Sequence, residues 1–261
     1  MKCPDFVFHV IFIFVYPVYA FLHRNSACKR VGLHLTETGF ADKVSVRDVF
    51  RSLFFNALDS VRYLSRDKKM LARVHYENEH LIQNAIAAGL PVVGMSIHQG
   101  AFEMLHRCLC RYSSQVHLFT EPFPDKALTE TLRALRADPH LKEHRTSEIS
   151  TLLRQFLREK SVLALVTDQA KNAKGNTVTL FGKKTDLYLR LPLEANRLGA
   201  AVVTFRTFRN ADGNHTIRFE RCYAPRTNPE AFIDSFAHDV ETWISEHPEQ
   251  WAWNYHGLFA V

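Results

Sequence analysis

The sequence predicts an α/β fold: a mixed, largely parallel central sheet with helices on both faces, preceded by a hydrophobic anchor helix. Three observations support this prediction. Short, unbroken apolar runs alternate along the chain with amphipathic segments of helical period, as expected for buried parallel strands joined by helices. The turn signal Asn-Ala-Asp-Gly at 210–213 separates two such runs and predicts a hairpin. The segment 6–22 is apolar except for His9.

Length and composition favour one catalytic domain behind the N-terminal anchor. The chain has 261 residues, of which 46% are hydrophobic, and this is enough for one sizeable core. Internal repeats and Pro/Ser-rich linkers are absent from the sequence. We therefore expect an anchor over residues 1–24 and a single domain over residues 25–261.

The apolar segment 6–22 is expected to hold the chain on a membrane. It has 17 residues and contains Pro17, and roughly 17 to 25 apolar residues are needed to span a bilayer. A secretory signal is the alternative, but only Lys2 precedes the segment and no clean cleavage site follows it. Basic residues lie after the segment, at His23, Arg24, Lys29 and Arg30. The positive-inside rule then places the domain on the cytoplasmic side, whether the segment spans the bilayer or lies in its interface.

The remaining elements follow from periodicity and from stop signals. Apolar residues at helical spacing predict a helix over 46–64. A second helix over 80–88 ends at Gly89, with Pro91 shortly after it. The first core strand covers 91–97, and a helix is expected over 101–112. Further strands are expected over 115–120, 161–167, 177–181, 201–209 and 215–222, and further helices over 125–137, 147–159, 187–198 and 229–246.

The charge of the chain restricts the classes of partner that it can bind, and its cysteines indicate their redox state and whether they could bind a metal. The net charge of +6 suits nucleic acid, an anionic membrane or an acidic protein. Because no nucleic-acid-binding motif accompanies it, we expect no nucleic-acid partner. Five cysteines without framework spacing indicate reduced thiols, at Cys3, Cys28, Cys108, Cys110 and Cys222. His106-x-Cys-x-Cys110 has metal-ligand residue types, but on a helix Cys108 points away from the other two. We expect no metal and no cofactor.

The most informative stretch is Ser-Ile-His-Gln-Gly-Ala-Phe-Glu at 96–103. It places His98 at the carboxyl end of a strand, the edge at which open α/β sheets bind ligands. Glu103 would lie in the first turn of the next helix. An imidazole with a carboxylate partner can take a proton from a hydroxyl, and Gly100 would let a substrate approach closely. The alternative is a histidine that ends a strand and bonds a carbonyl.

The residues 98–103 resemble the His-x-Gly-Asn-Trp-Glu form of the His-x4-Asp/Glu signature of bacterial lipid A lauroyl and myristoyl acyltransferases, in the lysophospholipid acyltransferase superfamily. Five further segments resemble that family in the same order: Arg51-Ser-Leu-Phe-Phe-Asn56, Leu165-Val-Thr-Asp-Gln169, Gly175-Asn-Thr-Val-Thr-Leu-Phe-Gly182, Glu194-Ala-x-x-x-Gly-Ala200 and Pro248-Glu-Gln-Trp-Ala-Trp253. The chain departs from the family at Ala101-Phe102, Leu187 and Arg190.

This resemblance implies a membrane-associated O-acyltransferase on the cytoplasmic face of the inner membrane. It would move a fatty acyl chain from an acyl thioester, with acyl carrier protein as donor, to a hydroxyl of a lipid A precursor or a related glycolipid or phospholipid. His98 would be the general base and Glu103 its orienting partner. Transfer would be direct, without an acyl-enzyme. The acceptor lipid and the acyl chain length are not readable from the sequence.

The resemblance and the predicted sheet edge nominate further binding residues. The N–H groups of Gln99 and Gly100 are expected to stabilise the oxyanion. The family keeps an arginine in the helix over 125–137, which is Arg136 or Arg133 here. Asp168 would hold Arg136 or bind an acceptor hydroxyl, unless it only caps a turn. Gln169 and Gly182 lie in matching segments, and the nearby lysines suit an anionic head group or an acidic carrier: Lys171, Lys174, Lys183 and Lys184.

Two other function classes stay open. Gly94-Met-Ser-Ile-His98 is one residue from the Gly-x-Ser-x-Gly elbow of serine hydrolases and thioesterases, with Ser96 as nucleophile. A non-enzymatic lipid-binding protein would need no Glu103.

Overall fold

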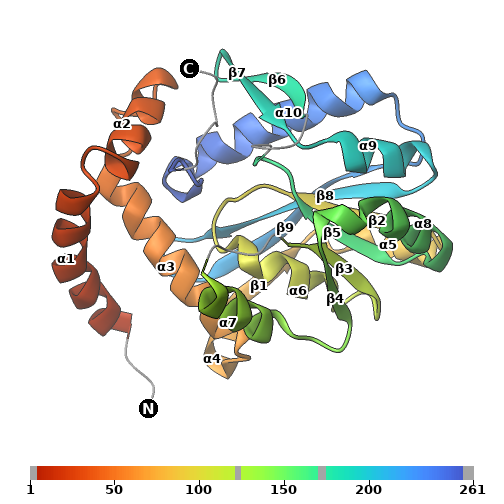
Figure 1. Cartoon of the computed structure of the whole chain (residues 1–261), viewed down its shortest axis with the longest axis horizontal. Coiled ribbons are helices and arrows are strands. Elements are labelled where there is room, and N and C mark those ends of the chain that lie inside the picture. The colour runs from red at the N-terminus through yellow and green to blue at the C-terminus, as the bar shows by residue number, and fades with distance from the viewer. Residues whose placement is uncertain (1–4, 121–124, 170–174, 255–261) are drawn as a thin grey trace.

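The computed structural model describes residues 5–120, 125–169 and 175–254 (Figure 1). Cys3, Lys171 and Lys174 lie outside this part of the chain. A seven-stranded sheet forms its centre, in the order β1-β9-β8-β2-β5-β3-β4. All neighbouring strands are parallel except β8 and β9, which form the expected antiparallel hairpin. The strands are β1 (Val74–Glu77), β2 (Val92–Ser96), β3 (Val116–Phe119), β4 (Leu141–His144), β5 (Val162–Val166), β8 (Ala201–Arg209) and β9 (His215–Tyr223).

Helices cover both faces of the sheet (Figure 1). They are α1 (Asp5–Leu22), α2 (Ala27–Glu37), α3 (Val46–Leu64), α4 (Lys68–Leu71), α5 (His80–Ala87), α6 (Leu105–Leu109), α7 (Lys126–Arg136), α8 (Ile149–Glu159), α9 (Arg190–Arg197) and α10 (Pro229–Glu246). Short 3-10 helices cover Phe102–Met104, Thr146–Glu148 and Pro248–Gln250. The prediction of a mixed, mostly parallel α/β sheet is therefore confirmed.

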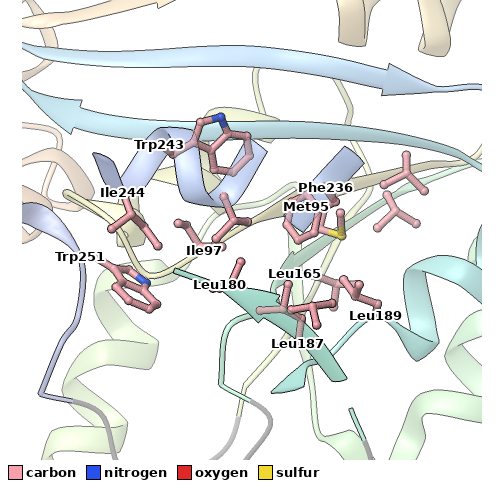
Figure 2. Close-up of a cluster of buried hydrophobic side chains, with 14 of the residues drawn as sticks. Met95, Ile97, Leu165, Leu180, Leu187, Leu189, Phe236, Trp243, Ile244 and Trp251 are labelled. Atoms are coloured by element: carbon pink, nitrogen blue, oxygen red, sulfur yellow. The ribbon is translucent and has the colours of Figure 1, made fainter. Parts of the chain in front are cut away.

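Alternate side chains of β2 enter two different cores, because successive residues of a strand point to opposite faces. Val93 and Met95 pack with the large core that contains Trp243 and Trp251 (Figure 2). Val92 packs with the core on the other face, under α5 and α6. Burial on both faces explains why this strand is an unbroken apolar run.

Two predicted helices are shorter than expected. The helix expected over 187–198 begins only at Arg190, because 183–187 form β7 (Lys183–Leu187) and pair antiparallel with β6 (Asn176–Leu180). Thr185 and Leu187 are buried while their neighbours are exposed, which is the period of a strand. The helix expected over 101–112 is divided into the 3-10 turn at 102–104 and the five-residue α6.

The N-terminal apolar segment is helical, but it does not stand apart as expected. α1 lies along α3 (Figure 1). Within the described residues, no single helix meets the length and hydropathy of a bilayer-crossing helix; α1 and α2 do so only as a pair, with a 90° bend between them. The anchor role and the division at residue 24 stay predictions.

Candidate active site

The parallel register of β2 and β5 brings His98 and Asp168 together. Ser96 pairs with Val166, so His98 and Asp168 both lie two residues beyond the last paired position, at one sheet edge. The backbone N–H of His98 donates to both carboxylate oxygens of Asp168, at 3.0 Å each. His98 Nδ1 lies 2.6 Å from Asp168 Oδ1. The first residue of the signature is thus fixed by a carboxylate 70 positions away.

Asp168 is only 4% exposed and is held on its other side by the C-terminal segment. Trp251 Nε1 donates to Asp168 Oδ2 at 2.8 Å. Burial by itself raises the pKa of Asp168, but the neighbouring His98 imidazole and the hydrogen bonds from His98 and Trp251 outweigh burial, and the pKa lies below its usual value. An ionised carboxylate only accepts hydrogen bonds. In its neutral form His98 therefore carries its proton on Nδ1, which leaves Nε2 as the unprotonated nitrogen that a general base uses.

Glu103 forms a different pair from the expected one. Arg136 donates to both of its carboxylate oxygens, from Nε at 2.9 Å and from the terminal nitrogen at 2.6 Å. Burial by itself raises the pKa of Glu103. The hydrogen bonds and positive charge of Arg136, with smaller contributions from His106 and His98, outweigh burial, so the pKa of Glu103 lies below its usual value. Both oxygens of Glu103 are therefore held by Arg136, and Glu103 acts on His98 only through its charge. The contact that orients the imidazole through Nδ1 comes from Asp168.

The same contacts distinguish the two arginines of α7. Arg136 is largely buried against Glu103, and Arg133, one turn earlier, is exposed. The expectation that Asp168 would hold Arg136 or merely cap a turn is corrected by this arrangement: Asp168 pairs with His98, and Arg136 pairs with Glu103.

Gly100 is required for a reason other than substrate approach. Its φ is +60°, and a Cβ at this position would lie 2.2 Å from the carbonyl oxygen of Thr207. The close neighbour is therefore the protein backbone. This left-handed residue turns the chain away from the direction of β2. The single helix expected over 101–112 therefore does not form.

The backbone donors expected to hold the oxyanion are already in use. The N–H of Gln99 donates to the Ile97 carbonyl at 2.8 Å, and the N–H of Gly100 donates to the Gln250 carbonyl at 2.9 Å. Ala252 in turn donates to the His98 carbonyl at 3.1 Å. The C-terminal segment thus pairs with the loop after β2, and both N–H groups that were expected to stabilise the oxyanion already have backbone acceptors.

The other nominated residues lie as follows. Gln169 follows Asp168 and is partly buried. Gly182 has φ +73° with open space around it, in the turn between β6 and β7, so the structure explains this glycine by its turn. Lys183 is partly buried and Lys184 is exposed on β7.

The geometry gives little support to a serine nucleophile or to a metal site. The Ser96 side chain is buried within β2, and its hydroxyl lies 3.4 Å from the Ile97 carbonyl. In residues 5–120, 125–169 and 175–254, no group of three His, Cys, Asp or Glu side chains is arranged to hold a metal ion. Cys108 is fully buried, and burial raises the pKa of its thiol.

Sequence reasoning did not include Trp251 in the site. The Pro-x-Gln-Trp-x-Trp segment at 248–253 carries part of the family resemblance, and that was its only signal. The sequence gives no indication that this indole reaches a carboxylate 83 positions earlier.

Comparison with known proteins shows the family of the chain. The model of the bacterial lipid A biosynthesis acyltransferase family matches residues 41–258, which include His98, Glu103, Arg136, Asp168 and Trp251. No individual curated protein matches the chain. Since the match covers most of its length, the chain belongs to the bacterial lipid A biosynthesis acyltransferase family.

Proposed function

We propose that this protein is a membrane-associated O-acyltransferase that uses His98 as its general base. The donor is an acyl thioester of acyl carrier protein, and the acceptor is a hydroxyl of a lipid A precursor or a related glycolipid. The reaction takes place at the cytoplasmic face of the inner membrane. The observation that supports this proposal most strongly is the hydrogen-bonded series from Trp251 through Asp168 to His98 Nδ1.

The proposed reaction is a single transfer without an acyl-enzyme. His98 Nε2 takes the proton of the acceptor hydroxyl as its oxygen attacks the thioester carbonyl. The tetrahedral oxyanion then collapses, the carbon–sulfur bond breaks, and the leaving thiolate takes the proton from the imidazolium. Asp168 stabilises the imidazolium that forms in between. A general base of this kind contributes about 10²- to 10⁴-fold to the rate.

Arg136 is the proposed side chain for the oxyanion. It uses two N–H groups on Glu103, and a guanidinium has five. Its remaining donors would face the thioester oxygen, in the role that the N–H groups of Gln99 and Gly100 do not fill. Glu103 then fixes the plane of the guanidinium and acts on His98 through its charge.

The direct test is acyl transfer by the purified protein and by His98→Ala, measured by mass spectrometry of the lipid product. His98→Ala should abolish transfer and keep a cooperative thermal unfolding transition, with a lower midpoint because the buried Asp168 loses its imidazole partner. Donor alone should leave the protein mass unchanged and release little thiol. Equal rates in the two proteins, or an acylated Ser96 or cysteine in the intact mass, would contradict the mechanism.

The acceptor class needs a separate experiment, because no motif reports it. Mass spectra of membrane lipids from cells with and without the protein should differ by one acyl chain on a glycolipid. A change confined to phospholipids would redirect the assignment of the acceptor while leaving the transfer chemistry in place.

A further inference from the structure

The most unusual surface of the molecule is the outer face of α1. Its large exposed side chains are all apolar, with exposed fractions from 40% at Ile11 to 73% at Phe14. The full set is Phe6, Val10, Ile11, Ile13, Phe14, Val15, Val18, Phe21 and Leu22. A continuous apolar face of this kind is rare on a soluble surface and marks an interaction site.

The inner face of α1 is packed against the folded body. Phe12 is 5% exposed, and its ring centroid lies 5.7 Å from that of Phe54 and 6.4 Å from that of Phe55. Further along, Tyr19 lies 5.1 Å from Phe50. The contacts run along α3 over several turns, so α1 is part of the fold along its length.

α3 itself cannot move away from the sheet without breaking the contacts of the buried Asp59, a hydrogen bond and an ion pair. Asp59 of α3 is 2% exposed, and its Oδ2 lies 3.0 Å from His215 Nε2 and 3.2 Å from Arg209 Nε. α3 also carries Arg47, Asp48, Arg51 and Arg62. Charges at this density do not enter the hydrocarbon core of a bilayer.

The helix after α1 is fixed as well. The guanidinium of Arg30 donates to the Asn254 carbonyl at 2.7 Å, and His34 Nδ1 lies 2.9 Å from the Trp253 carbonyl. The 90° bend between the two helices therefore has both of its arms held by the folded domain.

Basic groups lie at both ends of the apolar face. Arg24 lies over the ring of Phe21, 5.1 Å from its centroid, and Arg62 lies over Phe8 at 5.7 Å. Each guanidinium thus lies over an aromatic ring at one end of the apolar face, where its positive charge can meet anionic lipid head groups. Arg62 also lies 3.6 Å from Asp59. The net charge of +6 favours an anionic surface.

From these contacts we infer that α1 lies in the plane of an anionic phospholipid bilayer, with its outer face in the acyl-chain boundary and its inner face still on α3, and that it does not cross the membrane. Crossing would either strip α1 from α3 or carry the charges of α3 into lipid. This inference rests on the membrane attachment proposed above and specifies its geometry.

The geometry has a consequence for the active site. On its other side α3 contacts the short helices Phe102–Met104 and Pro248–Gln250, which flank His98 and Trp251. Packed helices lie about 8–10 Å apart, so an in-plane α1 keeps the general base about one helix layer from the bilayer surface, within reach of a lipid head group.

The first arm of the test uses the full chain and vesicles of phosphatidylethanolamine and phosphatidylglycerol, 3:1. Phe14→Glu, on the exposed face, should lower vesicle affinity at least tenfold and keep the thermal midpoint. Leu198→Glu, a 44% exposed leucine at the end of α9, is the matched control and should bind like wild type. Phe12→Ala should lower the thermal midpoint measured without vesicles, because its partners are on α3.

The second arm places an epitope tag ahead of Met1 and another after Val261 and treats intact spheroplasts with protease. Both tags should be protected, and both should be cleaved after lysis. Cleavage of the N-terminal tag from outside would show that α1 spans instead. An unchanged midpoint for Phe12→Ala would contradict the packing of α1 on α3, on which the in-plane geometry depends.

Other occupants of the apolar face give distinct results. If wild type forms a dimer in solution that Phe14→Glu breaks, while vesicle affinity is unchanged, the face binds a second copy and the inference fails. If wild type does not bind vesicles at all, the proposed membrane attachment fails with it, whereas acyl transfer to detergent-dispersed lipid would still report on His98.

Discussion

Replacing Asp168 by asparagine should remove the general base without removing the histidine. Oδ2 of Asp168 accepts from Trp251 Nε1, and both oxygens accept from the His98 N–H. The Trp251 indole N–H and the His98 backbone N–H can only donate hydrogen bonds, so the side-chain carbonyl oxygen of an asparagine at 168 must face them. The new amide NH₂ would then point at His98 Nδ1, which would have to become an acceptor. The imidazole proton would move to Nε2, the nitrogen that takes the proton from the acceptor.

The size of the loss follows from the role that is lost. General base catalysis supplies about 10²- to 10⁴-fold, which corresponds to about 2.7–5.4 kcal/mol of transition-state stabilisation at 1.36 kcal/mol per factor of ten. We expect kcat of Asp168→Asn to fall by that factor. KM for the donor should change little, since Asp168 is buried 2.6 Å behind the imidazole.

The assay is single-turnover transfer from acyl carrier protein to lipid, with product counted by mass spectrometry, and a thermal melt of each variant confirms folding. Glu103→Gln is the matched comparison, because it also exchanges one carboxylate oxygen for an amide beside the histidine. It should lose less, since its direct partner is Arg136. Wild-type kcat in Asp168→Asn together with a 10³-fold loss in Glu103→Gln would refute this reasoning and give the orienting role to Glu103.

Two further predictions concern stability. Gly100→Ala should destabilise the fold by more than the roughly 1–3 kcal/mol that a left-handed alanine costs, because its Cβ would lie 2.2 Å from the carbonyl oxygen of Thr207. Gly182→Ala, which has open space around it, should show only the cost of the left-handed backbone. Equal denaturation midpoints for the two variants would contradict the close contact at Gly100. The pKa of His106 is lowered from 6.5 to about 4, chiefly by burial, so the unfolded chain binds a proton that the folded chain does not between these values. His106 alone should therefore lower the stability by about 3 kcal/mol as the pH drops from 6.5 to 4, at 1.36 kcal/mol per unit. His106→Gln should make the pH dependence shallower in denaturation curves, and a slope equal to that of the wild type would contradict this contribution.

The sequence was sufficient to place His98 at the carboxyl edge of the sheet, because an unbroken apolar run that ends in histidine indicates a buried strand followed by the imidazole. It was not sufficient to find the partner of His98. Spacing favours the nearby Glu103, but the left-handed Gly100 redirects the chain, and the register of two parallel strands brings Asp168 instead. Register is a property of the folded sheet, which no local pattern encodes.

The edge strands show the same limit for the fold. β1 and β4 have four residues each, and β4 alternates Leu141 and Glu143 with Lys142 and His144. Such short, charged segments carry no apolar run. They extend the sheet because a neighbour offers unpaired backbone groups, and charge on an edge strand protects it from pairing with other chains. The longer elements, such as α3 and α10, could be predicted because their own periodicity defines them.

The attachment of the C-terminal segment has a consequence for biosynthesis. Trp251 holds Asp168, while Gln250 and Ala252 bond the backbone on either side of Gln99. A growing chain makes His98 and Asp168 well before these residues, at about 5–20 residues per second. The nascent chain therefore contains His98 and Asp168 before it contains the indole and the backbone groups that support them. A premature stop after α10 would yield a chain that carries the whole signature but lacks the Trp251 contact to Asp168.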